Sequence, residues 1–266
     1  MTSPTVRAPI FQLDSFTTTR FAGNPAAVVV LEQFLPDSSM QAIAAETNLA
    51  ETAFLVTTDT GHHLRWFTPT VEVKLCGHAT LATAAVVMER LELGREKVVF
   101  ESMSGPLTVH RSGSRYVMDF PARPSEPVAL PEGLAEALGA VPVEVHLNSF
   151  NYLAVFENAD VVRNLRPDMN AIAQIDREGV IVTAPGDAPY DFTSRYFAPA
   201  KGIPEDPVTG GAHCMLTPYW AERLGKTDFL GFQASSRGGE VTCGLRGDRV
   251  RLEGSCVFYL EGEIQI

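Results

Sequence analysis

The sequence predicts an α+β protein with two pseudo-repeated domains, each a barrel-like, mostly antiparallel sheet wrapped around a central helix. The first observation is repetition: the expected element order ββα ββα βββ occurs twice, RWFTP at 65–69 resembles RYFAP at 195–199, and ERL at 89–91 recurs at 222–224. The second is that each half contains one helix that is apolar nearly all round, which predicts burial on every side. A sheet curled around such a helix also covers its own edges.

Alternating apolar residues and β-branched residues predict the strands of the first half. A helix is expected at 38–48, where Ser38 and Gln41 fit a capping box. The central helix is expected from Gly77 to about residue 92, and the segments KVVFESM, PLTVHR and RYVMDF then predict three more strands. The earlier strands are expected at 10–16, 26–31, 52–57 and 63–69.

The second half repeats this order. Asp168 is the expected cap of a helix at 168–175, and a central helix is expected at 210–224. The Pro-rich segment PARPSEP at 121–127 is the expected linker, which gives domains at 1–121 and 128–256. The expected strands are VEVHLNS, YLAVFE, GVIVTA, DFTSRYFAP, GEVTCGL, RVRLEG and CVFYLEGEIQI.

Composition excludes several classes of protein. The 266 residues carry a net charge of −11 with no run of Lys or Arg, so a nucleic-acid partner is not expected. The four cysteines form no C-x-x-C pair and show no zinc spacing, which favours a reducing, cytoplasmic setting. The N-terminus resembles no signal peptide and the longest apolar stretch is too short to span a bilayer, so no membrane partner is expected.

The two central helices begin at glycine-rich turns, at Gly77 and at Gly210-Gly211. The first N–H groups of a helix have no intrahelical acceptor, and the helix dipole places partial positive charge beside them. Each start can therefore bind an anion. If the two halves are related by a pseudo-twofold axis, both starts can face one cleft, which predicts a small carboxylate as the ligand.

Four polar side chains accompany these helix starts. His78 lies in the first turn of the first central helix, and Asp206 precedes the second. Glu51 begins a strand, and Asn24 lies in a turn. Each also has an ordinary structural interpretation, as a hydrogen-bonded His, a helix-capping acid, a solvated strand end and a turn residue. Together, a Glu, a His and an Asp beside two anion sites predict an acid/base site.

The segments FAGNPAAVV, NLAETAFL, RWFTP, LCGHATLA, RYFAP and EDPVTGGAH, in this order, resemble the PhzF family of phenazine-biosynthesis isomerases across essentially the whole chain. The resemblance implies the fold of diaminopimelate epimerase, with the active site in the cleft between two similar domains. It also implies that the strand at 257–266 completes the first domain. A homodimer and a reaction without cofactor or metal are implied as well.

By the same resemblance, Glu51 is the acid/base that moves a carbon-bound proton within a small conjugated carboxylic acid. His78 contacts the substrate and positions the transfer, and Asp206 is a second catalytic acid. The residues implied to bind substrate are Asn24, Cys76, Gly77, His78, Thr209, Gly210 and Gly211.

Two departures keep alternatives open. Gly211 stands where the phenazine enzyme has a serine, and Cys76 stands where that enzyme has no cysteine. One alternative is a racemase or epimerase of an amino-acid-like substrate in which Cys76 is a base. A symmetric two-thiol version is disfavoured because the matching place on the second helix holds Pro207-Val208-Thr209. The other alternative is a non-catalytic protein that binds small acids.

Overall fold

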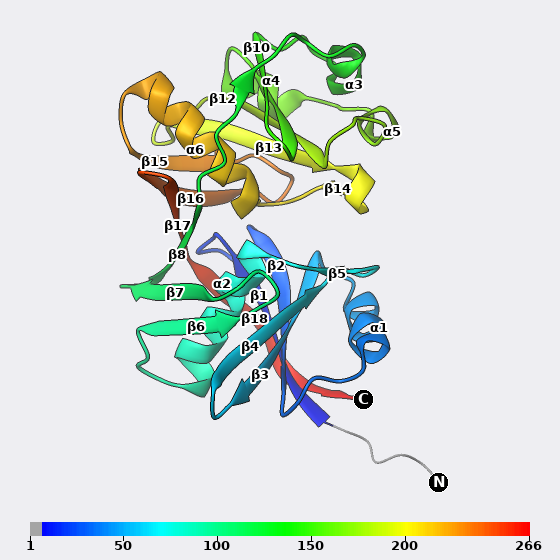
Figure 1. Cartoon of the computed structure of the whole chain (residues 1–266), viewed down its shortest axis with the longest axis vertical. Coiled ribbons are helices and arrows are strands. Elements are labelled where there is room, and N and C mark those ends of the chain that lie inside the picture. The colour runs from blue at the N-terminus through cyan, green and yellow to red at the C-terminus, as the bar shows by residue number, and fades with distance from the viewer. Residues whose placement is uncertain (1–6) are drawn as a thin grey trace. The chain divides into compact units, whose positions relative to one another are not determined.

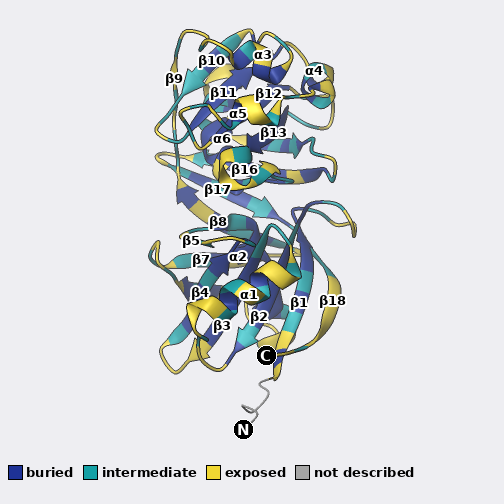
Figure 2. Cartoon of the chain, turned by 90° about the vertical axis from the view of Figure 1, so that its right-hand side faces the viewer, coloured by how far each residue is buried: buried dark blue, intermediate teal, exposed yellow. Residues whose placement is uncertain are grey.

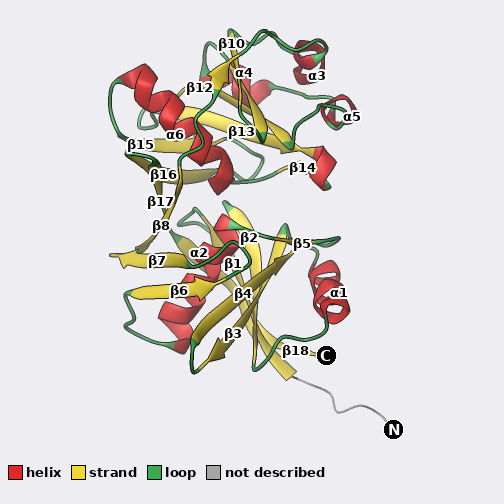
Figure 3. Ribbon diagram, viewed as in Figure 1, coloured by secondary structure: helices red, strands yellow, loops and turns green. Residues whose placement is uncertain are grey.

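The computed structural model describes residues 7–266, which fold into two compact units. The first unit runs up to Asp119 and also takes in Gly254–Ile266, and the second is Phe120–Glu253. Each unit is a mostly antiparallel sheet with a buried helix, so the predicted α+β class is confirmed (Figure 3). Among the described residues, no helix is both long and apolar enough to cross a membrane.

The first unit follows the predicted order, with short additions. Its helices are α1 (Asp37–Thr47) and α2 (Gly77–Val86), and α2 continues into a π-helical turn, η1 (Val87–Leu91). Its strands are β1 (Arg7–Ser15), β2 (Asn24–Leu31), β3 (Glu51–Thr58), β4 (Gly61–Phe67), β5 (Glu72–Val73), β6 (Lys97–Glu101), β7 (Leu107–Ser112), β8 (Arg115–Pro121) and β18 (Cys256–Gln265).

The C-terminal strand β18 pairs with β1 in the first unit. The pairing is antiparallel and runs from Arg7 opposite Gln265 to Ser15 opposite Cys256. Strands β1 and β2 are also antiparallel, whereas β2 and β3 are parallel. Parallel neighbours begin at the same edge of a sheet, so the first residues of β2 and β3 lie close together.

Helix α2 is the buried helix of the first unit. All of its residues from His78 to Val86 are buried, and it packs against β1, β2, β3 and β18 (Figures 1 and 2). The small side chains of its Ala-rich sequence let the surrounding strands approach closely. In η1 the Glu92 N–H donates to the Val87 carbonyl at 2.7 Å, one residue further back than in an α-helix.

Helix α1 packs on the outer side of β3 and β4. Met40 and Ala44 are its buried residues, and they join a cluster in which Phe54 and Phe67 meet edge to face at 5.5 Å. The predicted helix is confirmed, but the predicted capping box is wrong. Pro36 is the N-cap and no side chain caps the helix, because Gln41 instead donates from Nε2 to the Thr68 carbonyl.

The second unit contains more short helices than the sequence predicts. Asp168 caps α5 as expected, accepting hydrogen bonds from the N–H groups of Asn170 and Ala171. The helices are α3 (Leu134–Leu138), α4 (Ala159–Asn164), α5 (Met169–Ile172), the 3₁₀ turn η2 (Pro199–Lys201) and α6 (Gly210–Leu224). The strands are β9 (Glu126–Pro127), β10 (Glu144–Leu147), β11 (Asn151–Val155), β12 (Gly179–Pro185), β13 (Phe192–Ala198), β14 (Ile203–Glu205), β15 (Asp228–Gln233), β16 (Gly239–Arg246) and β17 (Arg249–Gly254).

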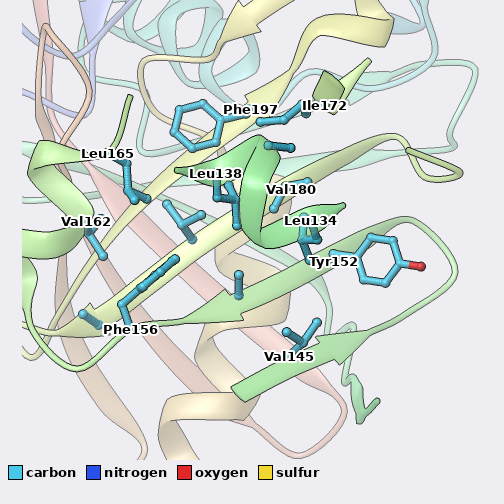
Figure 4. Close-up of a cluster of buried hydrophobic side chains, with 14 residues drawn as sticks. Leu134, Leu138, Val145, Tyr152, Phe156, Val162, Leu165, Ile172, Val180 and Phe197 are labelled. Atoms are coloured by element: carbon cyan, nitrogen blue, oxygen red, sulfur yellow. The ribbon is translucent and has the colours of Figure 1, made fainter. Parts of the chain in front are cut away.

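Two hydrophobic features stabilise this unit. Helices α3, α4 and α5 cover one face of β10–β13, where Leu138, Val162 and Phe197 are among the buried side chains (Figure 4). Helix α6 contains Pro218, which has no N–H to donate to the carbonyl of Cys214. The Arg123 N–H donates to that carbonyl at 2.9 Å, so the linker segment satisfies the acceptor that the proline leaves free.

A matching ion pair in each unit supports the internal repeat. Arg65 on β4 donates from Nε and Nη2 to Glu72 on β5, at 2.6 and 2.7 Å. Arg195 on β13 donates from the same two nitrogens to Glu205 on β14, at 2.7 and 2.9 Å. Each Glu precedes the glycine that begins the central helix by five residues, so the extra residues of the second copy lie in the turn around η2.

Candidate active site

A tight turn brings the first polar residues of the site together. Gly23 has φ +65°, and a Cβ atom there would lie 2.1 Å from the Ser15 carbonyl oxygen, so only glycine fits. The turn places Asn24, the first residue of β2, opposite Ser15, the last residue of β1. Both side chains are fully buried.

Glu51 and the start of α2 lie at the same end of the sheet. Asn48 ends α1 in the left-handed conformation, and β3 then begins at Glu51, whose register partner on β2 is Ala26. Cys76 is the N-cap of α2 and makes no capping hydrogen bond with its side chain. The N–H groups of the first turn of α2 are thus left to an external acceptor.

His78 is the centre of a compact cluster. Its Nε2 lies 3.2 Å from Glu51 Oε2, and its Nδ1 lies 3.1 Å from the Asn24 amide nitrogen and 3.5 Å from Cys76 Sγ. Ser15 donates from Oγ to the His78 carbonyl at 2.9 Å, which fixes the backbone of this turn. His78 is only 5% exposed and the Glu51 side chain 12%, so bulk water reaches this cluster poorly.

Burial and charge act in opposite directions on His78. Burial disfavours the imidazolium, but the acidic groups of Cys76 and Glu51 outweigh burial and hold the pKa of His78 well above 6.5. Burial is also the main reason that the Cys76 thiol has its pKa raised to about 11, with the Glu51 charge adding to it. Because that thiol is neutral at pH 7, Glu51 is the charge that favours the imidazolium.

The proton positions in the cluster depend on the charge of His78. In the neutral ring, the Asn24 amide nitrogen donates to Nδ1, so the ring proton is on Nε2 and faces Glu51. In the imidazolium, Nδ1 also carries a proton and its neighbour Cys76 Sγ can accept it. In both states Nε2 presents a proton to the carboxylate.

The predicted residues of the second unit gather at the start of α6. Thr209 is the N-cap and donates from Oγ1 to Asp206 Oδ2 at 2.6 Å. The buried side chain of Gln233 accepts from the Thr209 N–H at 2.9 Å and donates to the Asp206 carbonyl at 2.8 Å. Asp206 therefore does not cap the helix itself; it is oriented by the N-cap residue and by Gln233.

His213 lies one turn into α6, under these residues. Its Nδ1 donates to the Thr209 carbonyl at 2.8 Å, and the ring is completely buried. Burial lowers the pKa of His213 to about 4, so the ring is neutral at physiological pH. His213 thus supports the helix start and is not itself a charged group there.

The predicted site residues form two groups. Asn24, Glu51, Cys76, Gly77 and His78 come together at one end of the first unit. Asp206, Thr209, Gly210 and Gly211 come together at the start of α6 in the second unit. The use of both groups by one substrate stays a prediction.

Sequence reasoning missed Ser15 and Gln233. Ser15 ends an ordinary strand and Gln233 ends β15, and neither residue lies in a recognisable motif. Their roles come from hydrogen bonds to residues 63 and 24 positions away in the chain. The only sequence signal was that a polar residue follows a run of strand-forming residues in both places.

Residues 13–262 match the family model described as phenazine biosynthesis-like protein, PhzC-PhzF. The chain belongs to this PhzC-PhzF family. An uncharacterized isomerase of Pseudomonas aeruginosa is 47% identical over 257 residues, which are 97% of this chain and 98% of that protein. Relatives at this level carry the name isomerase, so the family supports an isomerase in general terms.

Solved structures give the same assignment. A PhzF family protein of Enterococcus faecalis is 42% identical, with a TM-score of 0.95 over 98% of this chain and 100% of that one. A hydroxyproline epimerase of Agrobacterium vitis shares only the fold, with 10% identity and a TM-score of 0.65 over 98% and 93% of the two chains. The predicted PhzF resemblance and epimerase-like fold are therefore confirmed.

Proposed function

We propose that this PhzC-PhzF protein is an isomerase that moves a carbon-bound proton within a small conjugated carboxylic acid, with Glu51 as the proton carrier. One observation carries the proposal: Glu51 Oε2 lies 3.2 Å from Nε2 of the buried His78, at the start of a buried helix. A carboxylate paired with a histidine in a site poorly reached by water is suited to take up a proton and return it.

In the proposed reaction, the Glu51 carboxylate removes a proton from a carbon next to a conjugated system. The electron pair of that C–H bond spreads into the conjugated system and its carboxylate. The N–H groups at the start of α2 and the His78 imidazolium stabilise the resulting negative charge. Glu51, now a carboxylic acid, delivers the same proton to another carbon, so the enzyme returns to its starting protonation state.

The proposed roles of the second-unit residues follow from the charge at the start of α6. The backbone N–H groups of Gly210 and Gly211 would bind a substrate carboxylate, and no side chain caps this helix either. Gly211 is exposed and a Cβ atom there would contact nothing within 4 Å, so a larger residue would fit without strain. The proposal includes Asp206 as a second acid held in place by Thr209.

A racemase that uses Cys76 as a base is the second candidate, because Cys76 Sγ lies 3.5 Å from His78 Nδ1. The electrostatics argue against it. A base must be a thiolate, whereas burial and the Glu51 charge raise the pKa of Cys76 to about 11. The matching residue of the second unit is Thr209, which cannot replace a thiol base.

Proton exchange separates these functions. A panel of conjugated amino and hydroxy acids is incubated with the protein in heavy water and followed by NMR. Glu51→Gln is expected to abolish deuterium incorporation while substrate affinity changes by less than about tenfold, because the amide keeps the shape of the carboxylate but cannot take up a proton. Glu46→Gln is the matched control, since Glu46 is an exposed residue of α1.

The outcomes distinguish the candidates. Exchange that survives Glu51→Gln contradicts the assignment of the base. Exchange that survives Glu51→Gln but is lost in Cys76→Ala favours the thiol. Binding without any exchange in the wild-type protein favours a non-catalytic protein that binds small acids.

A further inference from the structure

The Cys76 thiol is the one member of the cluster that the proposed proton transfer does not use. It is buried, it makes no capping hydrogen bond, and it lies against a histidine and a carboxylate. The donor atoms of Glu51, Cys76 and His78 all lie within 4.8 Å of one another, the only such group of this kind among residues 7–266. A carboxylate, a thiol and an imidazole together form a donor set typical of zinc sites.

The distances in the cluster are close to those around a tetrahedral zinc ion. Zinc bonds of about 2.0–2.2 Å to N and O and about 2.3 Å to S place an N and an O ligand about 3.4 Å apart, and an N and an S ligand about 3.6 Å apart. His78 Nε2 and Glu51 Oε2 are 3.2 Å apart, and Nε2 and Cys76 Sγ are 4.0 Å apart. A small rotation of the Cys76 side chain closes the remaining gap.

We propose that Glu51, Cys76 and His78 together bind a divalent cation of the zinc type, and that the bound cation inhibits the protein. The site goes beyond the proposed function, because it gives the cluster a ligand that is neither substrate nor product. The inhibitory effect alone rests on that function. With the metal bound, the Glu51 oxygen and His78 Nε2 are both coordinated, so neither can accept or stabilise the transferred proton.

The charges balance in the bound state. The thiol loses its proton to solvent on coordination, and an imidazolium loses the proton on Nε2. A thiolate and a carboxylate then neutralise the two positive charges of the cation, and the imidazole is a neutral ligand. Three protein ligands leave one coordination position for water or for a small anion at the start of α2.

Neighbouring residues already hold two of the ligands. Asn24 contacts His78 Nδ1, and rotation of its amide would present the oxygen to the Nδ1 proton that a metal-bound ring carries. Ser15 donates to the His78 carbonyl, and Thr80 donates from Oγ1 to the Cys76 carbonyl at 2.5 Å. These contacts make the site partly preorganised, so coordination needs little rearrangement of the backbone.

Cobalt(II) is the probe that tests the site, because a cobalt–thiolate bond gives a charge-transfer absorption in the near ultraviolet. The full-length protein is first treated with a chelator, and Co²⁺ is then added. We expect one Co²⁺ per chain with the thiolate band, and displacement of Co²⁺ by Zn²⁺. Absence of the band in the wild-type protein overturns the proposal.

Two cysteine variants make the test specific. Cys76→Ala is expected to abolish the band and to weaken Zn²⁺ binding by at least about 100-fold, since even outer-shell partners are worth about 10–100-fold. Cys214→Ala is the matched control, because Cys214 is equally buried in the other central helix but belongs to no such cluster among the described residues. A band that persists in Cys76→Ala, or that disappears in Cys214→Ala, contradicts the assignment.

A third variant separates this inference from the proposed function. Glu51→Gln is expected to keep the cobalt–thiolate band while weakening the affinity, because the amide is a poorer ligand than the carboxylate. Thermal melts of each variant check that it is folded. Metal binding without proton exchange would refute only the proposed isomerase, and proton exchange without metal binding would refute only the metal site.

Discussion

Cys76 and Thr209 are equivalent residues of the two repeats: each is the N-cap of the buried helix of its unit, and neither caps with its side chain. In both units the N-cap carbonyl accepts a hydrogen bond from the side chain four residues later, from Thr80 Oγ1 in one and from His213 Nδ1 in the other. The backbone device is the same and the chemistry is not. The first repeat carries the thiol and His78, and the second carries a hydroxyl and Gly211.

The protonation of His78 is the first testable consequence. Because the Glu51 charge opposes the effect of burial, the pKa of His78 is well above 6.5. An NMR titration of the ring protons should therefore show a midpoint above 6.5 in the wild-type protein. In Glu51→Gln the opposing charge is gone and burial dominates, so the midpoint should fall below 6.5. An unchanged midpoint would show that Glu51 does not set the charge of this ring.

This pair also predicts the sign of one pH effect on stability. Since the pKa of His78 is raised in the folded state, its contribution to the free energy of unfolding is fully present below pH 6.5 and is lost as the pH rises through the folded-state value. Urea unfolding of wild type and His78→Gln should show a larger difference at pH 6 than at pH 10. A difference that grows with pH would contradict the assignment.

His213 should act in the opposite direction. Its pKa is lowered to about 4 by burial, so protonation below pH 6.5 favours the unfolded chain. Between pH 6.5 and 4 this group alone should lower the free energy of unfolding by about 3 kcal/mol, from about 2.5 pKa units at 1.36 kcal/mol each. His213→Thr retains a hydroxyl donor for the Thr209 carbonyl, as Thr80 does for Cys76.

The measurement is urea unfolding of wild type and His213→Thr at pH 7.5 and pH 5. The smaller side chain leaves a cavity, so the variant is expected to be less stable at both pH values. Only the change with pH tests the prediction: the gap between the two proteins should narrow at pH 5. A gap of constant size would mean that His213 is not forced to stay neutral in the folded state.

Gly23 offers a test of how the turn before β2 builds the site. A Cβ atom at Gly23 would lie 2.1 Å from the Ser15 carbonyl oxygen, whereas a Cβ atom at Gly113 would meet nothing within 4 Å. Both glycines have φ near +63°, so both alanine variants carry the same backbone penalty of about 1–2 kcal/mol. Gly113→Ala is therefore a matched control for the clash alone.

Gly23→Ala is expected to lose clearly more stability than Gly113→Ala in urea unfolding. It should also lower proton exchange on any active acid, because the clash displaces Asn24 and Ser15, which hold His78. Gly113→Ala should exchange at the wild-type rate. Equal effects of the two variants would mean that the turn relaxes without moving the site.

Much of this protein followed from local sequence patterns. Asp168 caps its helix through its own backbone neighbours, and the apolar segment 210–224 is helical over the predicted range, because hydrogen bonds within a few residues decide both. The doubled order of elements was visible for the same reason. The capping box at Ser38 failed where a distant acceptor, the Thr68 carbonyl, held Gln41 instead.

The tertiary structure alone decided the electrostatics and the supporting contacts of the site. Ser15 and Gln233 act on residues far away in the chain, and no local pattern encodes such a contact. The raised pKa of Cys76 and the lowered pKa of His213 both come from burial, which depends on how the strands close around each helix. The sequence determined which chemical groups stand at the helix starts, and folding determined their charge, because desolvation is a property of the packed chain.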